Sequence, residues 1–434
     1  MKFLYRLVLA LAMLVLVLGW ILYLARNSAV AVVIDLLPVA LPLFGLGVLL
    51  SLVIVLRSAR VHWPTIVVAI ASLAGLGCSL WSFAAGVPSE NVAFTSGSVE
   101  LRGTVYSAKG ESRSPGVVLV HGSGRETRSE HRFYARFLAE RGITTLAFDK
   151  RGAGASSGNT YEADYLDYAD DVVAAVECLA RLTNVDPNRV GLVGFSEAEW
   201  VAPVAENRSD SIAFIVIIGA SGLRPVDQVE EEIRLRLERK GFAESDVQKA
   251  EALHRLYSDY LRGTADAPRV RSEIEKASRT PWFAAAEDLP DQVYPREEYA
   301  WWRRVMDFDP APYWRRVDVP VLLLKGTEDD RSAAEPSAER LKAMISAPLE
   351  VRLFQGADHM LLQWPIAPGV PPPVFAAGYP QIVADWILRT VRGPAKGILN
   401  GSVAWGGPSG WRAGDNATVL GSGDPHFALW TMLD

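Results

Sequence analysis

The pattern that most limits what this chain can fold into is an alternation that runs from residue 92 to residue 392. Short apolar runs, such as residues 117–120 and 190–193, end at turn residues and are separated by stretches of helical period, such as residues 165–182. Strands that alternate with helices pair in parallel, and strands without polar residues fit burial on both faces. The alternation therefore predicts an α/β architecture, with a mostly parallel, doubly wound sheet covered by helices on both sides.

Three apolar runs precede this pattern, at residues 7–25, 36–56 and 66–86, and none contains a charged residue. A helix of about 20 apolar residues is long enough to cross the core of a bilayer. The first run also resembles a cleaved signal peptide, because a cleavage-like Ala-Val-Ala follows at residues 29–31. However, it is longer than the usual apolar region of a signal, and two further runs follow it. The sequence therefore predicts a membrane anchor of three transmembrane helices within residues 1–88.

The basic residues around these runs predict the orientation of the anchor. Four of them flank the ends on one side of the membrane: Lys2, Arg6, Arg57 and Arg60. Only Arg26 flanks the other side. Lys and Arg concentrate on the cytoplasmic side, so the N-terminus is expected inside. An odd number of spans then places everything after Pro88 on the extracytoplasmic side of the cell membrane.

Composition excludes several classes of function. The net charge is −6 and the pI is about 5.7, which is the wrong sign for a nucleic-acid-binding protein. Two cysteines, Cys78 and Cys178, make neither a disulfide framework nor a cysteine-based zinc site. The chain also has no metal-ligand spacing and no dinucleotide fingerprint, so no metal and no cofactor are expected.

The strongest chemical signal is a serine placed between a buried strand and a helix, in Gly194-Phe195-Ser196-Glu197-Ala198. The nucleophile elbow of many hydrolases reads G-x-S-x-G, and small residues are needed because the turn is tight. Here Ala198 replaces the last glycine. Taken alone, the pattern also fits an ordinary turn with a capping serine. A nucleophilic serine needs a base, so the histidines decide between the two interpretations.

Of six histidines, His359 is the candidate base, because it follows the last strand at the edge where the carboxyl ends of parallel strands converge. Its orienting acid is expected in the loop after the preceding strand, which contains Glu328, Asp329 and Asp330. We choose Asp329, with Asp330 as the alternative. The chain order Ser196, Asp329, His359 is the nucleophile–acid–base order of one large fold.

An oxyanion hole requires backbone N–H groups that point at the developing negative charge. One donor is expected from Glu197, directly after the nucleophile. The other is expected from the loop at residues 121–124, at Ser123, because the glycines there let the backbone approach a substrate. A phosphate-binding loop is disfavoured, since the spacing and the lysine of such loops are missing.

Five motifs in order carry a family resemblance: HGSG at 121–124, DKRGAGASSG at 149–158, GFSEAE at 194–199, GTEDD at 326–330 and GADH at 356–359. Residues 92–392 thus resemble the α/β-hydrolase superfamily, and especially bacterial esterases and serine-peptidase-like relatives with a helical cap. The resemblance implies the α/β-hydrolase fold with a cap insertion. It also implies a Ser196–Asp329–His359 triad. The departures are Ala198 and Glu199, where relatives usually carry two glycines.

The expected domains follow from these boundaries: anchor 1–88, first part of the hydrolase core 89–222, helical cap 223–311, second part of the core 312–392 and a Gly/Ser-rich tail 393–434. The insertion is either a cap over the site or a solvated helical excursion. Trp282, Trp301 and Trp302 favour the cap, because charged helices alone would not need tryptophans. In a cap, Trp301 and Trp302 would close an acyl pocket; the alternative is that both only anchor the insertion to the core. Five apolar side chains of the insertion are expected to face the site: Leu235, Leu237, Leu253, Leu256 and Tyr257.

The function expected is that of a membrane-anchored serine hydrolase that cleaves carboxylic esters through an acyl-enzyme on Ser196. A serine peptidase of the same fold, resembling an aminopeptidase or an acylaminoacyl-peptidase, is the alternative, and a thioesterase also fits. Glu230, Glu231 and Glu232 are candidates for binding a substrate amino group, or form a solvated helix face. A non-catalytic binding or sensor module is disfavoured, because all three triad positions are filled. The partner expected is a small-molecule ester or a short peptide.

Overall fold

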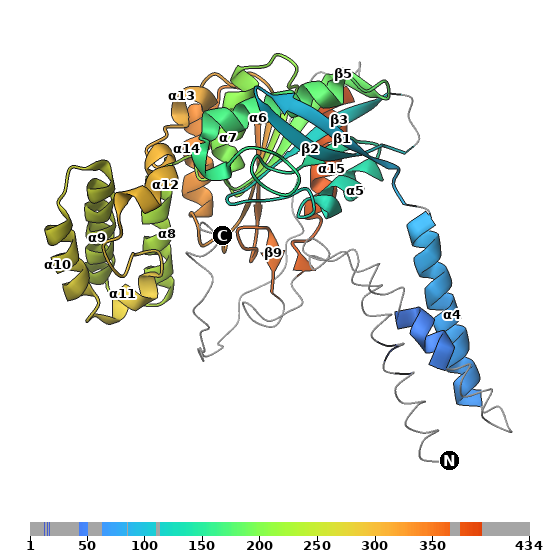
Figure 1. The fold of residues 1–434 in the computed structure, drawn as a ribbon, viewed down its shortest axis with the longest axis horizontal. Helices are drawn as coiled ribbons and strands as arrows, with labels where there is room; N and C mark the ends of the chain where they lie inside the picture. Colours follow the sequence, from blue (N-terminus) through green and yellow to red (C-terminus); the bar gives the residue numbers. More distant parts are fainter. Residues whose placement is uncertain are drawn as a thin grey trace, which may run out of the picture.

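The computed structural model describes the following residues: 13, 15, 17, 43–50, 63–84, 86–109, 113–364 and 374–392. In this part of the chain, eight strands form one sheet in the order β1-β2-β4-β3-β5-β6-β7-β8 (Figure 1). Their bounds are Ser89–Ser96, Val99–Tyr106, Ser114–Val120, Thr144–Phe148, Val185–Phe195, Ile215–Ile218, Val321–Gly326 and Leu349–Phe354 for β1 to β8. β2 pairs antiparallel with β1 and β4, and all other neighbours pair in parallel. The predicted mostly parallel sheet is confirmed.

Helices cover both faces of the sheet. They are α5 (Arg132–Ala139), α6 (Tyr165–Ala180), α7 (Ala198–Asn207), α14 (Ala334–Met344) and α15 (Tyr379–Arg392). Alternate residues of β3 point to opposite faces: Val118 and Val120 join one apolar cluster with α6 and α7, while Val117 and Leu119 join another with α5 and α15. Burial on both faces is the reason why residues 117–120 of this strand are all apolar.

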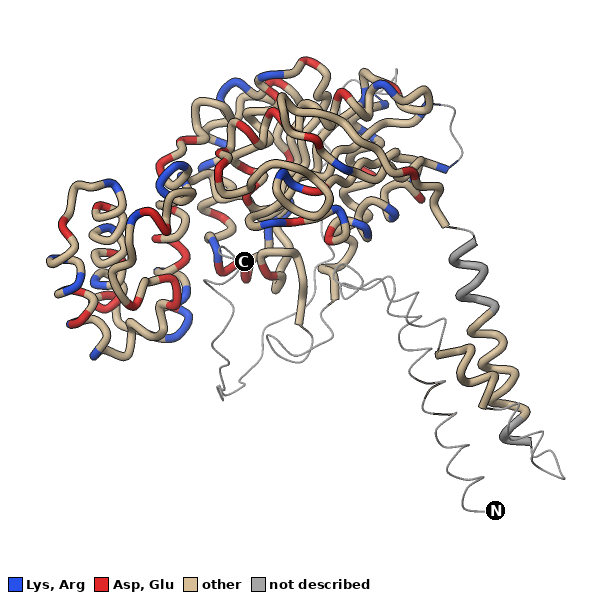
Figure 2. Tube along the Cα trace, in the orientation of Figure 1, with Lys and Arg blue, Asp and Glu red and all other residues tan. Residues whose placement is uncertain are grey.

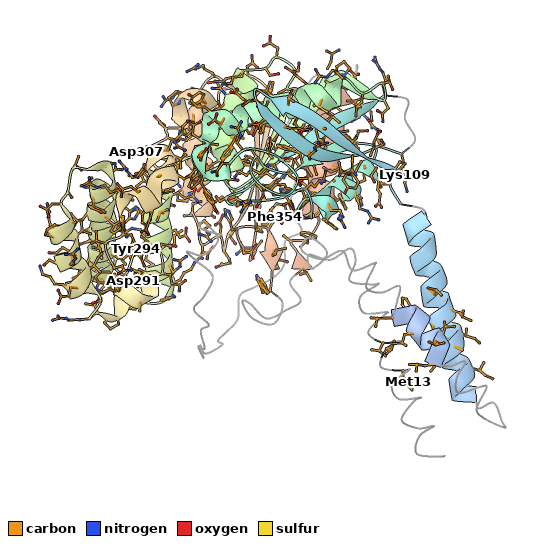
Figure 3. All side chains as sticks on the ribbon, in the orientation of Figure 1. Met13, Lys109, Asp291, Tyr294, Asp307 and Phe354 are labelled. Carbon is orange, nitrogen blue, oxygen red and sulfur yellow. The ribbon has the colours of Figure 1, made fainter. Side chains whose placement is uncertain are left out.

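The segment between β6 and β7 forms a helical lobe beside the sheet (Figure 1). Its helices are α8 (Pro225–Arg239), α9 (Glu244–Arg262), α10 (Ala267–Ala277), α11 (Pro281–Ala286) and α12 (Ala300–Val305). The next helix, α13 (Ala311–Trp314), packs against the sheet domain, where Trp314 lies in the apolar core. The surface of the lobe carries both acidic residues (Asp and Glu) and basic residues (Lys and Arg), as Figure 2 shows. At its junction with the sheet, Asp307 accepts hydrogen bonds from Arg262 and pairs with Arg224 at 3.8 Å (Figure 3).

The lobe has an apolar core of its own. Leu237, Leu253 and Tyr257 lie in it, and Leu256 packs against it. The expectation that these side chains face the active site is therefore wrong for these four. The physical reason is that a bundle of amphipathic helices can bury its apolar faces among its own members, leaving no apolar stripe for the sheet. Trp302 contacts both this core and the core of the sheet domain.

A long helix, α4 (Trp63–Ala84), leads into β1. Residues 43–50 are also helical, and Phe44 lies so close to Gly75 that a Cβ there would be 2.2 Å from its ring. Within the described residues, no helix has both the length and the apolarity that crossing a membrane requires. The first predicted span lies outside these residues except for positions 13, 15 and 17, and the second is described only over 43–50. The tail at 393–434 lies wholly outside them.

Candidate active site

Ser196 occupies a strained turn between β5 and α7. Its φ is 50°, a left-handed conformation that residues other than glycine rarely adopt. The turn is held by the Ser196 N–H, which donates to the Ile218 carbonyl at 2.8 Å. A Cβ on Gly194 would lie 2.6 Å from Cβ of Ala198, so the methyl of Ala198 fits only because residue 194 is glycine. The alanine at the last position of the motif is therefore compatible with the elbow.

His359 contacts both of the other side chains that the sequence pointed to. Its Nε2 lies 2.9 Å from Ser196 Oγ, and its Nδ1 lies 2.9 Å from Asp329 Oδ2. Two glycines make room for this arrangement. A Cβ on Gly219, whose φ is +81°, would lie 2.8 Å from the His359 ring, and one on Gly326 would lie 2.1 Å from the carbonyl oxygen of Ala357. The structure thus brings the three candidate residues into one hydrogen-bonded chain.

Asp329, rather than Asp330, is the acid at His359. Asp329 is 1% exposed, and its Oδ1 accepts the N–H of Arg331 at 2.8 Å. Its Oδ2 also accepts a hydrogen bond from the ammonium of Lys325 at 2.8 Å. Burial alone would raise the pKa of this carboxyl, but His359 and Lys325 together hold the pKa well below its usual range. These two contacts favour the ionised form of Asp329.

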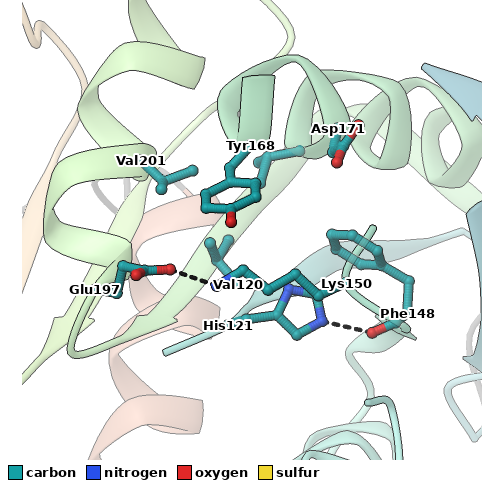
Figure 4. Close-up of a pocket in the computed structure, with 9 residues that line it drawn as sticks. Val120, His121, Phe148, Lys150, Tyr168, Asp171, Glu197 and Val201 are labelled. Carbon is teal, nitrogen blue, oxygen red and sulfur yellow. Dashed lines mark hydrogen bonds and ion pairs between the residues drawn. The ribbon is translucent and has the colours of Figure 1, made fainter. Parts of the chain in front are cut away.

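The expected oxyanion donors belong to two segments that share a buried ion pair (Figure 4). The ammonium of Lys150 donates to the Gly122 carbonyl at 3.0 Å and to Oε1 of Glu197. Burial raises the pKa of the Glu197 carboxyl, and the Lys150 ammonium acts in the opposite direction. These contacts hold the loop that contains Ser123 against the start of α7, where Glu197 lies.

The other described histidines have structural roles. Nε2 of His121 lies 2.6 Å from the Phe148 carbonyl, and burial lowers the pKa of this ring to about 3 (Figure 4). Nε2 of His254 lies 3.0 Å from the Val226 carbonyl, and burial lowers its pKa to about 4. His131 pairs with Glu126. Of the histidines that the structure describes, His359 is thus the one in contact with Ser196.

Glu199, the unexpected charge of the GFSEAE motif, is hydrogen-bonded to the loop that leads into the helical insertion. It is 1% exposed and accepts three hydrogen bonds, from the N–H of Ser221 at 2.9 Å, the Ser221 hydroxyl at 2.8 Å and the N–H of Gly222 at 2.8 Å. Burial raises the pKa of Glu199 to about 7, while these donors act in the opposite direction. Glu199 therefore joins α7 to the loop from which α8 departs.

The three acids considered for a substrate amino group are already paired with arginines of the chain. The pairs are Glu230 with Arg255, Glu231 with Arg340, and Glu232 with Arg236 and Arg331. Two of these arginines come from the core after β7, so the pairs fasten α8 to the sheet domain. Among the described residues, no group of three His, Cys, Asp or Glu side chains could hold a metal ion.

Sequence reasoning missed two lysines of the site, Lys150 and Lys325. Lys325 is completely buried at the end of β7, where its ammonium also reaches Ser332 Oγ at 2.8 Å. The signal that could have found it is a lysine at the end of an otherwise apolar strand, because a buried cation requires an anionic partner. Lys150 lies inside the DKRGAGASSG motif, and its partners Gly122 and Glu197 are far from it in the sequence.

The chain is similar to Esterase EstD of Thermotoga maritima, with 24% identity over 270 residues, covering 60% of this chain and 58% of EstD. It therefore spans less than two thirds of that relative. The Quorum-quenching protein AidA of Acinetobacter baumannii is 34% identical over 108 residues, which cover 24% of this chain and 35% of AidA.

A solved structure of hypothetical protein PA2218 from Pseudomonas aeruginosa is 20% identical, with a TM-score of 0.44, and covers 70% of this chain and 94% of that one. The model of the Alpha/beta hydrolase family matches residues 117–365, more than half of the chain. This range contains Ser196, Asp329 and His359. The chain therefore belongs to the alpha/beta hydrolase family.

Proposed function

We propose that this protein is a serine hydrolase that cleaves carboxylic ester bonds through an acyl-enzyme on Ser196. The observation that carries the proposal is the hydrogen-bonded chain from Ser196 through His359 to Asp329, at the carboxyl edge of the sheet. A serine hydroxyl becomes nucleophilic when a base can accept its proton, and the buried carboxylate orients that base. Membership of the hydrolase family and the similarity to an esterase support the same reaction.

The geometry suggests the order of steps. Ser196 Oγ attacks the ester carbonyl carbon while Nε2 of His359 accepts the hydroxyl proton. The oxyanion that forms is stabilised by the N–H groups of Ser123 and Glu197. When this intermediate collapses, the carbon–oxygen bond to the alcohol breaks and His359 gives its proton to the leaving oxygen. A water then attacks the acyl-enzyme with His359 again as base, which releases the acid and restores Ser196. Asp329 stays ionised throughout.

Ester cleavage is favoured over an aminopeptidase reaction by the charges around α8. An aminopeptidase needs a free carboxylate to bind the substrate amino group, and Glu230, Glu231 and Glu232 are each committed to an arginine. A substrate without a charged amino group requires no such acid. Small-molecule esters meet this condition, whereas the substrates of an aminopeptidase do not.

Steady-state hydrolysis of p-nitrophenyl esters tests this proposal. Ser196→Ala is expected to lower kcat by about 10³-fold or more, the loss expected on removal of a triad member. The matched control is Ser272→Ala, an exposed serine on α10, which should leave kcat unchanged. Equal activity of Ser196→Ala and the control would contradict the proposal.

We further propose that residues 1–88 anchor the chain in a membrane and place the hydrolase domain on the extracytoplasmic side. Three apolar runs without a charged residue and the excess of Lys and Arg at one set of ends support this topology. In a bacterial host, the chain should stay in the membrane fraction at high pH, and protease added to intact spheroplasts should cut the hydrolase domain. Recovery in the soluble fraction would contradict the anchor, and protection from protease would contradict the orientation.

A further inference from the structure

One buried ammonium group joins the two segments that carry the expected oxyanion donors. Lys150 is 4% exposed and follows β4. Its Nζ donates to the carbonyl oxygen of Gly122 at 3.0 Å and to the carboxylate of Glu197, which is 1% exposed (Figure 4). It also lies 4.4 Å from the centre of the Tyr168 ring, a cation–π contact that holds it from the side of α6.

The contact with Gly122 controls the direction of the Ser123 N–H. The Gly122 carbonyl and the Ser123 N–H belong to the same peptide unit, and in a planar trans peptide these two groups point in opposite directions. An ammonium that holds the carbonyl on one side therefore turns the N–H to the other side. The preceding peptide is held as well, because the Gly122 N–H donates to Oε2 of Glu126 at 2.8 Å. A Cβ on Gly122 would lie 3.0 Å from Oε1 of Glu126, so glycine suits this position.

The contact with Glu197 connects the same ammonium to the second donor. Glu197 provides its backbone N–H directly after the nucleophile, and its side chain is held by Lys150. Three groups in contact thus connect the Ser123 and Glu197 donors and fix the distance between them: the Gly122 carbonyl, the Lys150 ammonium and the Glu197 carboxylate. The Glu197 carboxylate neutralises the lysine, and the Gly122 carbonyl accepts a second hydrogen bond from the same ammonium.

We propose that Lys150 is the positioning residue of the oxyanion hole, which it assembles by joining the Gly122 carbonyl to the Glu197 carboxylate. The inference rests on the proposed function, because an oxyanion forms only if Ser196 attacks a carbonyl. Hydrogen bonds weaken steeply when donor and acceptor are misaligned, and loss of one oxyanion donor costs about 10²- to 10³-fold in kcat. Misplacement of the Ser123 donor should therefore cost about 10- to 100-fold.

The test compares Lys150→Met with the double variant Lys150→Met/Glu197→Gln. The single variant leaves the Glu197 carboxylate buried without its cation, so it is expected to lose stability. The double variant removes this unpaired charge while leaving the Gly122 carbonyl without its donor. Lys342→Met, an exposed lysine on α14, is the matched control. All rates are divided by the concentration of active sites, titrated with a fluorophosphonate, so that unfolded protein does not count.

The second readout is inhibition by a trifluoromethyl ketone. Ser196 Oγ adds to its carbonyl carbon, the hydroxyl proton moves to His359, and the carbonyl electron pair becomes an oxyanion in the hole. Both Lys150 variants should show kcat about 10- to 100-fold lower, KM within about twofold of wild type, and Ki for the ketone raised by the same factor as kcat/KM falls. The double variant should recover the melting temperature but not kcat.

Recovery of wild-type kcat and Ki by the double variant would overturn the inference, since Lys150 would then only neutralise Glu197. A change in KM alone would also overturn it, because the hole acts on the transition state. Failure of the proposed function looks different: wild type itself would not react with the fluorophosphonate at Ser196. In that case the role of Lys150 in an oxyanion hole falls as well.

Discussion

Replacing Glu199 by Gln is expected to make the unfolding free energy less dependent on pH between about 4.5 and 7. The carboxyl of Glu199 is buried, and its Oε2 accepts the N–H groups of Ser221 and Gly222, while its Oε1 contacts the Ser221 hydroxyl. A glutamine fits the same contacts. Its carbonyl oxygen can accept both N–H groups, and its amide can donate to the hydroxyl, as the protonated acid does.

The sign follows from the raised pKa. Burial raises the pKa of Glu199 from 4.5 to about 7. Between these values the folded state keeps a proton that the unfolded state has lost, so the unfolding free energy falls as the pH rises through this window. A shift of this size corresponds to about 3 kcal/mol, since one pKa unit is worth about 1.4 kcal/mol. Glutamine does not titrate, so the variant escapes this loss.

The assay is urea unfolding of the full chain in detergent, followed by tryptophan fluorescence at pH 5, 6, 7 and 8. The quantity compared is the difference in unfolding free energy between Glu199→Gln and wild type at each pH. The contributions of other titrating groups cancel in this difference. One such group is Glu232, because burial also raises its pKa to about 7. The difference should increase by about 2.5 kcal/mol from pH 5 to pH 8, since part of the total change already lies below pH 5.

The control is Glu339→Gln, an exposed residue of α14, for which the difference should stay constant with pH. A Glu199→Gln difference that is equally constant, or that falls with rising pH, would refute the reasoning. Glu199 would then be ionised at little cost, and its three donors would outweigh its burial.

Three further outcomes are expected. Asp329→Asn should lower kcat by about 10⁴-fold without unfolding the protein, whereas Asp330→Asn should have little effect; a reversed ranking in ester turnover would make Asp330 the orienting acid. Lys325→Met should lower the unfolding free energy by about 3 kcal/mol, because the buried Asp329 carboxylate loses its lysine partner. An unchanged urea midpoint would contradict this. Trp302→Ala should cost about 2 kcal/mol of stability and slow short- and long-chain esters alike, since Trp302 packs against both apolar cores. A changed preference for acyl length with no loss of stability would instead place Trp302 in an acyl pocket.

Much of the fold could be predicted because its signals are local. Strands buried on both faces are mostly apolar, and the turns after several of them carry the glycines that the motifs contain. Gly326 of the GTEDD motif shows why the motifs are informative, since a side chain there would collide with the loop that carries His359. The same local rules indicated the residues now found in contact, Ser196, His359 and Asp329, whose catalytic roles remain predictions.

The remaining features depend on contacts between distant segments, which periodicity does not show. Helices α8 and α9 are amphipathic in sequence, but this pattern does not show which neighbour covers their apolar faces. They pack within the insertion instead of facing the sheet. Glu231 and Glu232 resemble a solvated helix face or a ligand site, and only the fold reveals that arginines beyond β7 reach them. The role of Lys150 likewise depends on a loop 28 positions earlier in the chain.

The nucleophile is tested most directly by identifying the residue that a fluorophosphonate modifies. The probe is incubated with the full chain in detergent, and the adduct is located by mass spectrometry of peptides. We predict one phosphonylated serine, Ser196, with no labelling of Ser196→Ala. Labelling of His359→Ala should be strongly slowed, because the base that accepts the serine proton is missing. Labelling of another serine, or equal labelling of wild type and Ser196→Ala, would contradict the claim that Ser196 is the nucleophile.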